Sequence, residues 1–314
     1  MAIYLVTGGA GFIGSHLVEE LVKRGEQVRV LDNFSTGKRE NLSDLQEKIE
    51  LVEGDIRSYH IVREVVQGVD FVLHQGALPS VPRSINDPIT TNEVNVGGTL
   101  NILDAARDAG VERVVYASSS SVYGANKALP KREDMIPQPI SPYAVAKLTG
   151  EKYCHVFSRT YGLETVALRY FNVFGPRQDP QSQYSAVIPR FVVGMMEGQE
   201  LTIHGDGTQS RDFTYVSNVV EANLLAVHAE GVSGEAFNLA CGASMSLNEV
   251  VEKIAQTLDC EGNIVYGPPR SGDVACSQAD ISRVRKYLDY EPLVEAGEGL
   301  ERVVLWFRKA AEKA

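Results

Sequence analysis

The amino-acid sequence predicts an α/β fold in which a doubly wound parallel sheet carries helices on both faces and a smaller α/β region is interleaved with it. Two observations predict this fold. Strand-like and helix-like segments alternate through the first half of the chain, and alternating βαβ units build a parallel sheet. A glycine-rich turn joins the first strand to the first helix, where such sheets bind ligands. After about residue 170 the alternation is lost and Gly and Pro become more frequent.

Each element of the first half has its own pattern. Residues 3–7 form a short apolar run that predicts a buried strand. Residues 12–24 carry apolar side chains at helical spacing, and those on one side are Ile13, Leu17, Leu21 and Val22. Further strands are predicted at residues 27–32, 50–55, 70–74 and 113–118. Helical patterns, such as those at 99–108 and 143–161, lie between and after these strands.

The composition is that of a globular protein without a polyanion-binding surface. Hydrophobic residues make up 44% of the 314 residues, and charged residues make up 23%. The net charge of −11 argues against nucleic acid as a partner, because phosphate backbones need a basic surface. The four Cys form no CxxC pair and the six His lack metal-ligand spacing, so no disulfide framework and no metal are expected. With no secretory signal and no membrane-length apolar run, we expect a cytoplasmic protein without a membrane partner.

The turn after the first strand has the pattern of a dinucleotide-binding loop. Residues 7–14 read TGGAGFIG and satisfy both GxGxxG and GxxGxxG. The glycines allow a pyrophosphate to approach closely, and the following helix offers it free N–H groups and a positive dipole end. Asp32 ends the second strand, where a carboxylate binds ribose hydroxyls and repels a 2′-phosphate. NAD is therefore favoured over NADP, although Lys38 and Arg39 lie nearby in the sequence.

A candidate catalytic group lies in the second quarter of the chain. Tyr143 and Lys147 form a YxxxK pattern on a predicted helix, where positions i and i+4 share a face. The serines at 118–121 follow the carboxyl end of a strand, where ligands of such sheets bind. We predict that the phenol exchanges the proton of a carbinol during hydride transfer, and that Lys147 and a cationic nicotinamide lower its pKa toward neutrality. A serine would relay the proton, although Ser118 fits a strand-end cap or turn equally well.

At these residues the sequence resembles the extended short-chain dehydrogenase/reductases, and among them the UDP-sugar 4-epimerases. The resemblance covers essentially the whole chain. Its further motifs are HQGA at 74–77, NVGGT at 95–99, RYFNVFGP at 169–176, RDF at 211–213 and RSGD at 270–273. Residues 80–88, SVPRSINDP, are similar to the bacterial UDP-N-acetylglucosamine 4-epimerases in particular. Gly76, in place of a more usual Ala, and Pro79 depart from the family pattern.

The resemblance implies a role for residues that are far apart in the chain. The implied catalytic residues are Tyr143, Lys147 and Ser119. The implied NAD contacts are Gly8, Gly11, Phe12, Ile13, Asp32, Asn33, Thr36, Gly37, Asp55, Ile56, Gln75, Ala77, Tyr143 and Lys147. The implied substrate contacts are Ser80, Ser119, Ser120, Ser121, Tyr143, Asn172, Gln178, Ala186, His204, Arg211, Arg270, Asp273 and Ser277. Arg169, on a predicted strand, fits a structural ion pair equally well.

The implied function is reversible 4-epimerisation of UDP-hexoses through a 4-keto intermediate. The implied substrates are UDP-GlcNAc and UDP-GalNAc, together with UDP-glucose and UDP-galactose. Sugar 4,6-dehydratases carry Asp-Glu where this chain has Ser120 and Ser121, so dehydration is not expected. UDP-glucuronate 4-epimerisation is an alternative, and a non-catalytic NAD sensor on the same fold is another.

The resemblance also implies how the chain is organised. Residues 1–170 and roughly 212–240 would form an NAD-binding Rossmann domain, and roughly 171–211 and 241–314 would bind the nucleotide sugar. Ser277 would stand at a gate where a small residue leaves room for an N-acetyl group. A homodimer is expected, because related enzymes pair two helices per subunit, here 99–108 and 143–161, in a four-helix bundle. The alternative is that the apolar sides of these helices face only the sheet.

Overall fold

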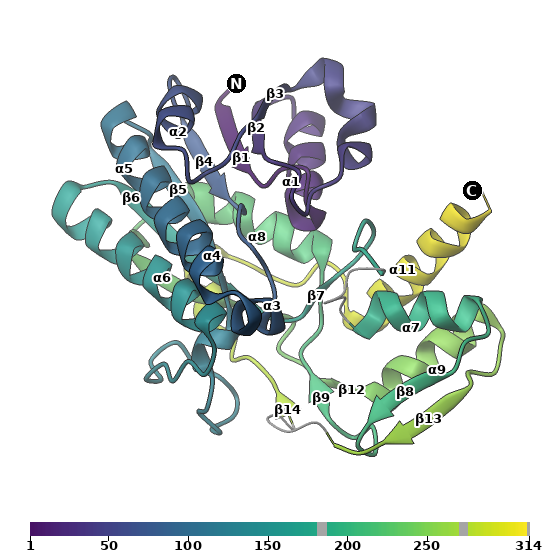
Figure 1. Ribbon diagram of the computed structural model, residues 1–314. Coiled ribbons are helices and arrows are strands. Elements are labelled where there is room, and N and C mark those ends of the chain that lie inside the picture. The colour runs from purple at the N-terminus through teal and green to yellow at the C-terminus, as the bar shows by residue number, and fades with distance from the viewer. Residues whose placement is uncertain (181–186, 270–275, 313–314) are drawn as a thin grey trace.

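The computed structural model describes residues 1–180, 187–269 and 276–312. Its largest element is a seven-stranded sheet in the order β11-β6-β5-β4-β1-β2-β3, in which every neighbouring pair is parallel. Helices lie on both faces of this sheet (Figure 1). The predicted doubly wound α/β fold is thereby confirmed.

The five strands predicted in the first half of the chain all occur in the large sheet, whose other two strands were not predicted with bounds. The strands of this sheet are β1 (Ile3–Thr7), β2 (Gln27–Asp32), β3 (Glu50–Glu53), β4 (Phe71–His74), β5 (Arg113–Ser119), β6 (Glu164–Tyr170) and β11 (Glu235–Leu239). The prediction of 50–55 was too long, because Asp55 already belongs to a turn in which its carboxylate accepts the backbone N–H of Arg57. The prediction of 70–74 began one residue early. Asp70 precedes the strand, and its carboxylate accepts the backbone N–H of Ile3 at the start of β1.

Two apolar cores lie on opposite faces of the sheet. The helices α1 (Phe12–Lys23), α8 (Val216–His228) and α10 (Ser282–Leu288) cover one face, and α2 (Tyr59–Val65), α5 (Thr99–Ala109) and α6 (Pro142–Tyr161) cover the other. Side chains of a strand alternate between the two faces. Accordingly Tyr4 and Val6 of β1 join the first core and Leu5 joins the second.

Short elements connect the strands near their carboxyl ends. A 3-10 helix, η1 (Arg39–Lys48), follows β2, and α3 (Val81–Asn86), α4 (Pro88–Asn92) and the π-helix η2 (Glu93–Gly98) lie between β4 and α5. A further 3-10 turn, η3 (Ser120–Tyr123), begins directly after β5. Because α3 and α4 pack against the start of α6, they bring the loop after β4 close to the predicted catalytic helix.

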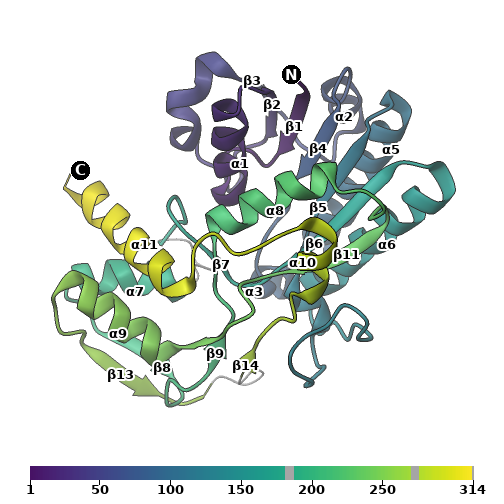
Figure 2. The same cartoon turned by 180° about the vertical axis from the view of Figure 1, so that it is seen from behind.

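The smaller region has its own core beside the carboxyl ends of the strands. It contains the helices α7 (Val187–Met196), α9 (Leu247–Leu258) and α11 (Ala296–Ala311). Its short strands are β7 (Val173–Phe174), β8 (Leu201–His204), β9 (Ser210–Arg211), β10 (Thr214–Tyr215), β12 (Met245–Ser246), β13 (Ile264–Gly267) and β14 (Cys276–Ser277). The view from behind shows that the chain crosses back to the large sheet through α8 and β11 and again through α10, so the two regions are interleaved (Figure 2).

Two searches over the described part of the chain returned nothing. Within 1–180, 187–269 and 276–312, no helix combines the length and the apolar character needed to cross a membrane. The same residues contain no group of three or more His, Cys, Asp or Glu side chains placed to hold a metal ion.

Candidate active site

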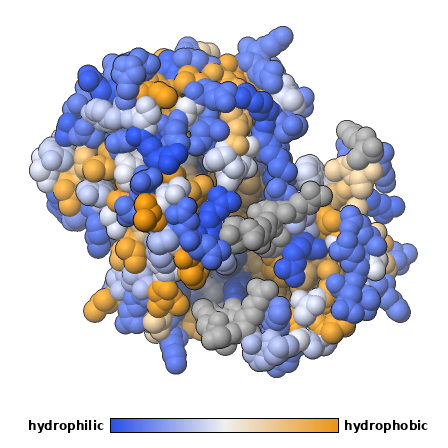
Figure 3. Space-filling view, viewed as in Figure 1, coloured by the Kyte–Doolittle hydropathy of each residue, from blue (hydrophilic) through white to orange (hydrophobic). Residues whose placement is uncertain are grey.

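A cavity opens at the carboxyl ends of the central strands. Among the residues that line it are most of the predicted cofactor contacts: Gly8, Gly11, Phe12, Ile13, Asp32, Asn33, Thr36, Asp55, Ile56, Gln75, Ala77, Tyr143 and Lys147. These residues come from segments that are far apart in the sequence, and the parallel strands bring them to one edge of the sheet. All of them belong to the large-sheet region, and we call the space that they line the dinucleotide cavity. The space-filling view shows that the surface is also hollowed between this region and the smaller one (Figure 3).

The glycines of the first turn are required by close backbone contacts. Gly8 has a φ of +66°, and a Cβ on it would lie 2.9 Å from the Cα of Gly76. A Cβ on Gly14 would lie only 2.1 Å from the carbonyl oxygen of Gly8. The helix α1 begins at Phe12, and its N-cap Gly11 provides no side-chain cap. The N–H groups of its first turn are therefore available to a pyrophosphate, which is the geometry NAD requires.

Asp32 is buried at the end of β2, next to the glycine turn. Its carboxylate accepts the backbone N–H of Ala10 at 2.9 Å and that of Phe34 at 2.8 Å. Burial raises its pKa, and these two hydrogen bonds oppose the rise. A Cβ on Gly37 would lie 2.9 Å from the Asp32 carboxylate, so this predicted contact shapes the carboxylate site although it does not line the cavity.

The two cations that follow Asp32 both have carboxylate partners. The ammonium of Lys38 lies 3.3 Å from the carboxylate of Asp179. Arg39 pairs with Glu53 and stacks its guanidinium over the ring of Phe34, 3.9 Å from the ring centroid. Both cations are thus paired with carboxylates and not held ready to bind a 2′-phosphate, which agrees with NAD as the cofactor.

Asp55, a predicted adenine contact, organises the part of the cavity wall that follows β3. Its carboxylate accepts hydrogen bonds from the guanidinium of Arg57 and from the amide of Asn33 at 2.9 Å. Arg57 holds the pKa of Asp55 at about 2. The carbonyl of Ile56 accepts a hydrogen bond from Asn101 at 3.0 Å, so the backbone here is held in place by α5.

The predicted catalytic residues lie close together, and two of them, Tyr143 and Lys147, line the cavity. Ser141 caps α6 by accepting the N–H of Ala144 at 3.2 Å, which places Tyr143 in the first turn of the helix and Lys147 one turn later. The ammonium of Lys147 donates to the carbonyl of Ala117 at 2.7 Å and lies 5.9 Å from the ring centroid of Tyr143. The hydroxyl of Ser119 lies near the phenol of Tyr143 and favours its ionised form.

Burial decides the ionisation of the catalytic pair in the protein alone. It raises the pKa of Tyr143, and the neighbouring hydroxyl of Ser119 opposes the rise. The expectation that Lys147 and a cationic nicotinamide together lower this pKa toward neutrality stays a prediction, because it concerns the enzyme with NAD bound. Burial also lowers the pKa of Lys147 to about 8, while the carboxylate of Glu151 acts in the opposite direction.

The four serines after β5 have different roles. Ser118 is turned inward and donates its hydroxyl to Glu151, so it is structural. Ser119 faces Tyr143 and also accepts the N–H of Ser121 at 3.2 Å. Ser120 begins the turn η3, and the hydroxyl of Ser121 is buried without a hydrogen-bond partner in the described part of the chain. Of the four, Ser119 alone meets the phenol, as predicted for the relay.

The loop after β4 holds further predicted contacts. Gln75 donates its amide to Asn223 at 3.2 Å and accepts the hydroxyl of Tyr170 at 3.1 Å. Ser80 has a φ of +97° and caps α3 by accepting the N–H of Arg83 at 3.3 Å. The sequence pattern contained no sign of Asn223, which reaches the site from α8.

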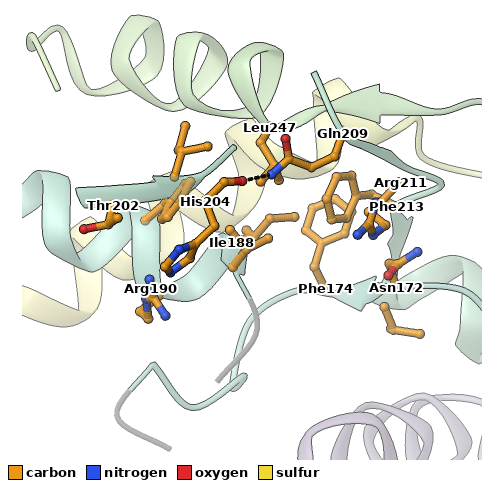
Figure 4. Close-up of a pocket in the computed structure, with 14 residues that line it drawn as sticks. Asn172, Phe174, Ile188, Arg190, Thr202, His204, Gln209, Arg211, Phe213 and Leu247 are labelled. Atoms are coloured by element: carbon orange, nitrogen blue, oxygen red, sulfur yellow. Dashed lines mark hydrogen bonds between the residues drawn. The ribbon is translucent and has the colours of Figure 1, made fainter. Parts of the chain in front are cut away.

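A second cavity lies in the smaller region and holds three of the predicted substrate contacts, Asn172, His204 and Arg211 (Figure 4). The amide of Asn172 donates to the carbonyl of Asp212 at 3.1 Å. The carbonyl of His204 accepts the amide of Gln209 at 2.6 Å, a bond that is drawn in Figure 4. The apolar part of the wall consists of Val173, Phe174, Val187, Ile188, Phe191, Ile203, Phe213 and Leu247. We call this space the nucleoside cavity.

Other predicted substrate contacts are near the nucleoside cavity or outside the described residues. Ser277 in β14 is paired with Arg211 in β9, and its carbonyl accepts the N–H of Asp212 at 2.8 Å. Gln178 donates to the carbonyl of Val173 at 3.2 Å, and its own amide oxygen is buried without a partner in the described part of the chain. Ala186, Arg270 and Asp273 lie outside the described residues. Arg190 on α7 lines the cavity and was missed, since nothing in the helical pattern distinguishes it.

Comparison with known proteins agrees with this geometry. The model of the NAD dependent epimerase/dehydratase family matches residues 4–240. A putative UDP-glucose 4-epimerase of Methanocaldococcus jannaschii is 39% identical, with 97% of this chain and 98% of the relative covered. The UDP-glucose 4-epimerase of Mycolicibacterium smegmatis is 38% identical, with 98% and 99% covered.

Solved structures share the fold over the whole chain. A UDP-N-acetylglucosamine 4-epimerase from Methanobrevibacter ruminantium M1, in complex with UDP-N-acetylmuramic acid, has a TM-score of 0.94 and 38% identity, with 98% of this chain and 99% of that chain covered. The UDP-glucose 4-epimerase of Thermotoga maritima, with UDP-glucose, has a TM-score of 0.93 and 38% identity over the same shares. A UDP-glucuronic acid 4-epimerase from Bacillus cereus, with UDP-glucuronic acid and NAD, has a TM-score of 0.90 and 31% identity, again over 98% and 99%. The chain is therefore an NAD-dependent enzyme that belongs to the NAD dependent epimerase/dehydratase family.

Proposed function

We propose that the protein interconverts UDP-hexoses by epimerisation at C4. The observation that carries the proposal is that Tyr143 and Lys147 line the dinucleotide cavity together, with the hydroxyl of Ser119 near the phenol. Ser120 and Ser121 stand where a dehydratase needs acidic side chains, so the chain lacks the acid that would expel a hydroxyl group. Oxidation at C4 and return of the hydride to the other face would need bound NAD as hydride acceptor and donor, and no acidic side chain in addition to Tyr143, Lys147 and Ser119.

The residues of the chain divide the proton chemistry among them. The phenolic oxygen of Tyr143 takes the proton of the C4 hydroxyl as a 4-keto sugar forms, and returns it after the sugar has turned over in the site. Lys147 stabilises the phenolate, and Ser119 holds or relays the proton. When bound, NAD supplies a hydride acceptor and donor and a positive charge beside the phenol. Because the hydride is returned in each cycle, we expect NAD to remain bound and to co-purify.

Retention of NAD is directly testable. Purified protein is denatured, and the released nucleotide is identified and counted per chain. We expect NAD close to one per chain and activity without added cofactor. A preparation that needs added NADP, and that NAD does not activate, would show that Asp32 and its buried carboxylate have been misinterpreted.

The substrates we propose are UDP-GlcNAc and UDP-GalNAc, together with UDP-glucose and UDP-galactose. The support is Ser277, whose small side chain lies in the strand next to Arg211 at the edge of the nucleoside cavity. A tyrosine here would add a phenol ring to a packed site, and overpacking cannot be relaxed cheaply. A serine leaves space for a 2-acetamido group.

The gate is tested with Ser277→Tyr and a panel of UDP-sugars. We expect the variant to lose turnover of N-acetylated substrates while turnover of UDP-glucose and UDP-galactose largely survives. Ser43→Tyr, at an exposed position in η1, is the matched control and should leave both substrate classes unaffected. Equal loss on both classes, or a wild-type enzyme that does not accept N-acetylated sugars, would contradict the gate.

Epimerisation of UDP-glucuronate is the second candidate. It is favoured by the structural similarity to the Bacillus cereus enzyme, which was solved with UDP-glucuronic acid and NAD. The same panel decides between the two, since interconversion of UDP-glucuronate and UDP-galacturonate alone would select it. NAD binding without turnover of any sugar would instead select the non-catalytic sensor.

We also propose that the protein is a homodimer formed through α6 and its neighbours. The exposed side of α6 carries Val145 and Val156, of which 50% and 46% remain accessible. Ile85 and Ile89 from α3 and α4, which pack beside α6, are 62% and 71% accessible. Large apolar side chains gathered on one side of a molecule are typical of an interface.

A further inference from the structure

A buried polar cluster lies directly behind the catalytic residues. Glu151 accepts two hydrogen bonds from the guanidinium of Arg169, at 2.9 and 2.8 Å, and a third from the hydroxyl of Ser118. Arg169 also donates to the phenol of Tyr123 at 2.9 Å, and Tyr123 donates to Asn238 at 2.6 Å. Only 5% of each charged side chain is accessible to solvent. The prediction that Arg169 forms a structural ion pair is therefore confirmed.

This cluster is part of a regular connection between α6 and the carboxyl end of β5. Three consecutive strand residues each meet a different turn of the helix: Ala117 accepts a hydrogen bond from Lys147, Ser118 donates one to Glu151, and the hydroxyl of Ser119 lies near the phenol of Tyr143. The first and the last of these contacts involve the proposed catalytic side chains themselves. The hydrogen bond from Ser118 to Glu151 fixes the strand residue that lies between the other two.

The helix and the strand also pack closely at this point. A Cβ on Gly150 would lie 2.2 Å from the hydroxyl oxygen of Tyr116 on β5. The helix is therefore as near to the strand as a residue without a side chain permits. A displacement of Glu151 would be transmitted to Ser119 and Lys147, because no loose packing separates them.

The charges around Glu151 leave one net positive charge at the site. Arg169 from β6 and Lys147 from α6 face its carboxylate, and the neutral groups around it are Ser118 and Tyr116 from β5 and Cys154 from α6. A buried ion pair is a poor source of stability, because apolar replacements of the same volume are often neutral or stabilising. A contribution to stability is therefore a weak explanation for the buried carboxylate of Glu151, which lies one helical turn after Lys147.

We propose that Glu151 is a positioning residue for the catalytic step, which holds Ser119 in register with Tyr143 through Ser118 and keeps Lys147 in its ammonium form through its carboxylate charge. The proposal rests on the proposed acid–base roles of Tyr143, Lys147 and Ser119. Arg169 compensates the charge of Glu151 and fixes its orientation with two parallel hydrogen bonds. The substrate does not need to touch either residue.

Two variants separate positioning from stability. Glu151→Gln keeps a hydrogen-bonding group near Ser118 and removes the charge. The double variant Glu151→Leu/Arg169→Met replaces the ion pair with apolar side chains and is expected to fold, since both charges of the pair are removed together. Glu164→Gln is the control, because Glu164 pairs with Arg113 at the opposite ends of the same two strands, β5 and β6.

We expect both Glu151 variants to retain NAD and an unchanged KM, and to lose at least about tenfold in kcat, a part of what acid–base catalysis contributes. The alkaline limb of the pH profile should move to lower pH, because Lys147 loses the carboxylate that favours its charged form. The control should change neither kcat nor the profile. A double variant with wild-type kcat and pH profile would reduce the pair to a structural role and overturn the proposal.

A second measurement does not depend on turnover. The titration of Lys147 is followed by NMR of protein labelled with 13C-lysine, with Lys147→Met to assign the signal. The midpoint should fall in both Glu151 variants and stay constant in Glu164→Gln. An unchanged midpoint overturns the electrostatic part of the proposal. If the wild-type protein is inactive on every UDP-sugar and the midpoint still falls in the Glu151 variants, the proposed function is overturned and only the electrostatic effect of Glu151 on Lys147 stands.

Discussion

At the scale of single residues, the chemistry of the site depends on how burial treats two ionisable groups. Tyr143 is partly buried and its phenol has a raised pKa, and Lys147 is buried with a pKa lowered to about 8. We therefore expect the phenol to act as a base when the positive charge of a bound cofactor lies beside it, which would couple proton transfer to cofactor binding. Ser119 is the one side chain of the serine run that meets this phenol.

Replacement of Tyr143 by Phe tests this assignment. We expect Tyr143→Phe to reduce kcat by at least about a hundredfold, the lower end for loss of a general acid–base. Ser119→Ala should lose less, since water can partly replace a relay. Steady-state kinetics and NAD content are measured on both, with Tyr161→Phe, at the exposed end of α6, as the control. Near-normal turnover of a folded Tyr143→Phe variant would remove Tyr143 from the mechanism.

At the scale of elements, the site depends on the turn between β1 and α1. This turn brings backbone atoms of two chain segments closer than side chains allow. The Cβ of an alanine at position 14 would lie 2.1 Å from the carbonyl oxygen of Gly8, and backbone on both sides leaves little room for relaxation. The same tight geometry aims the N–H groups of α1 at the dinucleotide cavity.

Gly14→Ala should therefore damage both stability and cofactor binding. We expect a loss of about 1–3 kcal/mol in the free energy of unfolding, as for other overpacked sites. NAD content per chain should fall as well. Gly297→Ala, in α11, is the matched control, because a Cβ there meets no atom within 4 Å, and it should change stability by no more than about 1 kcal/mol. Stability is measured by thermal or denaturant unfolding. A Gly14→Ala variant with wild-type stability and normal NAD content would show that the turn tolerates a side chain.

At the scale of the whole molecule, the arrangement of α3, α4 and α6 leaves apolar side chains on one outer face. Ile85, Ile89, Val145 and Val156 have few apolar neighbours within the chain to cover them, since each is about half accessible or more. The sides of α5 and α6 that face the sheet carry other residues, such as Ile102 and Phe157, which are buried in the core. The alternative that the apolar sides face only the sheet therefore does not account for Val145 and Val156.

A double charge substitution tests the proposed dimer. Wild-type protein should scatter light as twice the chain mass of 34.3 kDa at micromolar concentration. Val145→Asp/Val156→Asp should dissociate it, because two buried carboxylates per subunit would lose their hydration at the interface. Val265→Asp, at an exposed apolar position on β13, is the control and should leave the mass unchanged. A wild-type mass of 34.3 kDa would contradict the dimer.

The sequence by itself determined the elements whose signals are local. The glycine spacing at 8–14, the strands of the first half and the i, i+4 pair of Tyr143 and Lys147 are all visible within short windows, because turn geometry and periodicity act over a few residues. Their meeting at one cavity also followed, since ligands bind beyond the carboxyl ends of parallel strands. The resemblance added the family, which the comparisons confirm.

Where neighbouring side chains look alike in the sequence, only the tertiary structure decided which of them takes which role. Four serines in a row are equivalent in sequence, yet Ser118 turns to Glu151 and Ser119 turns to Tyr143. Arg169 pairs with Glu151, and Asn223 reaches Gln75 from α8, although these residues are far apart in the chain. Such choices depend on the distances at which helices pack on the sheet, and close packing of segments distant in sequence sets those distances.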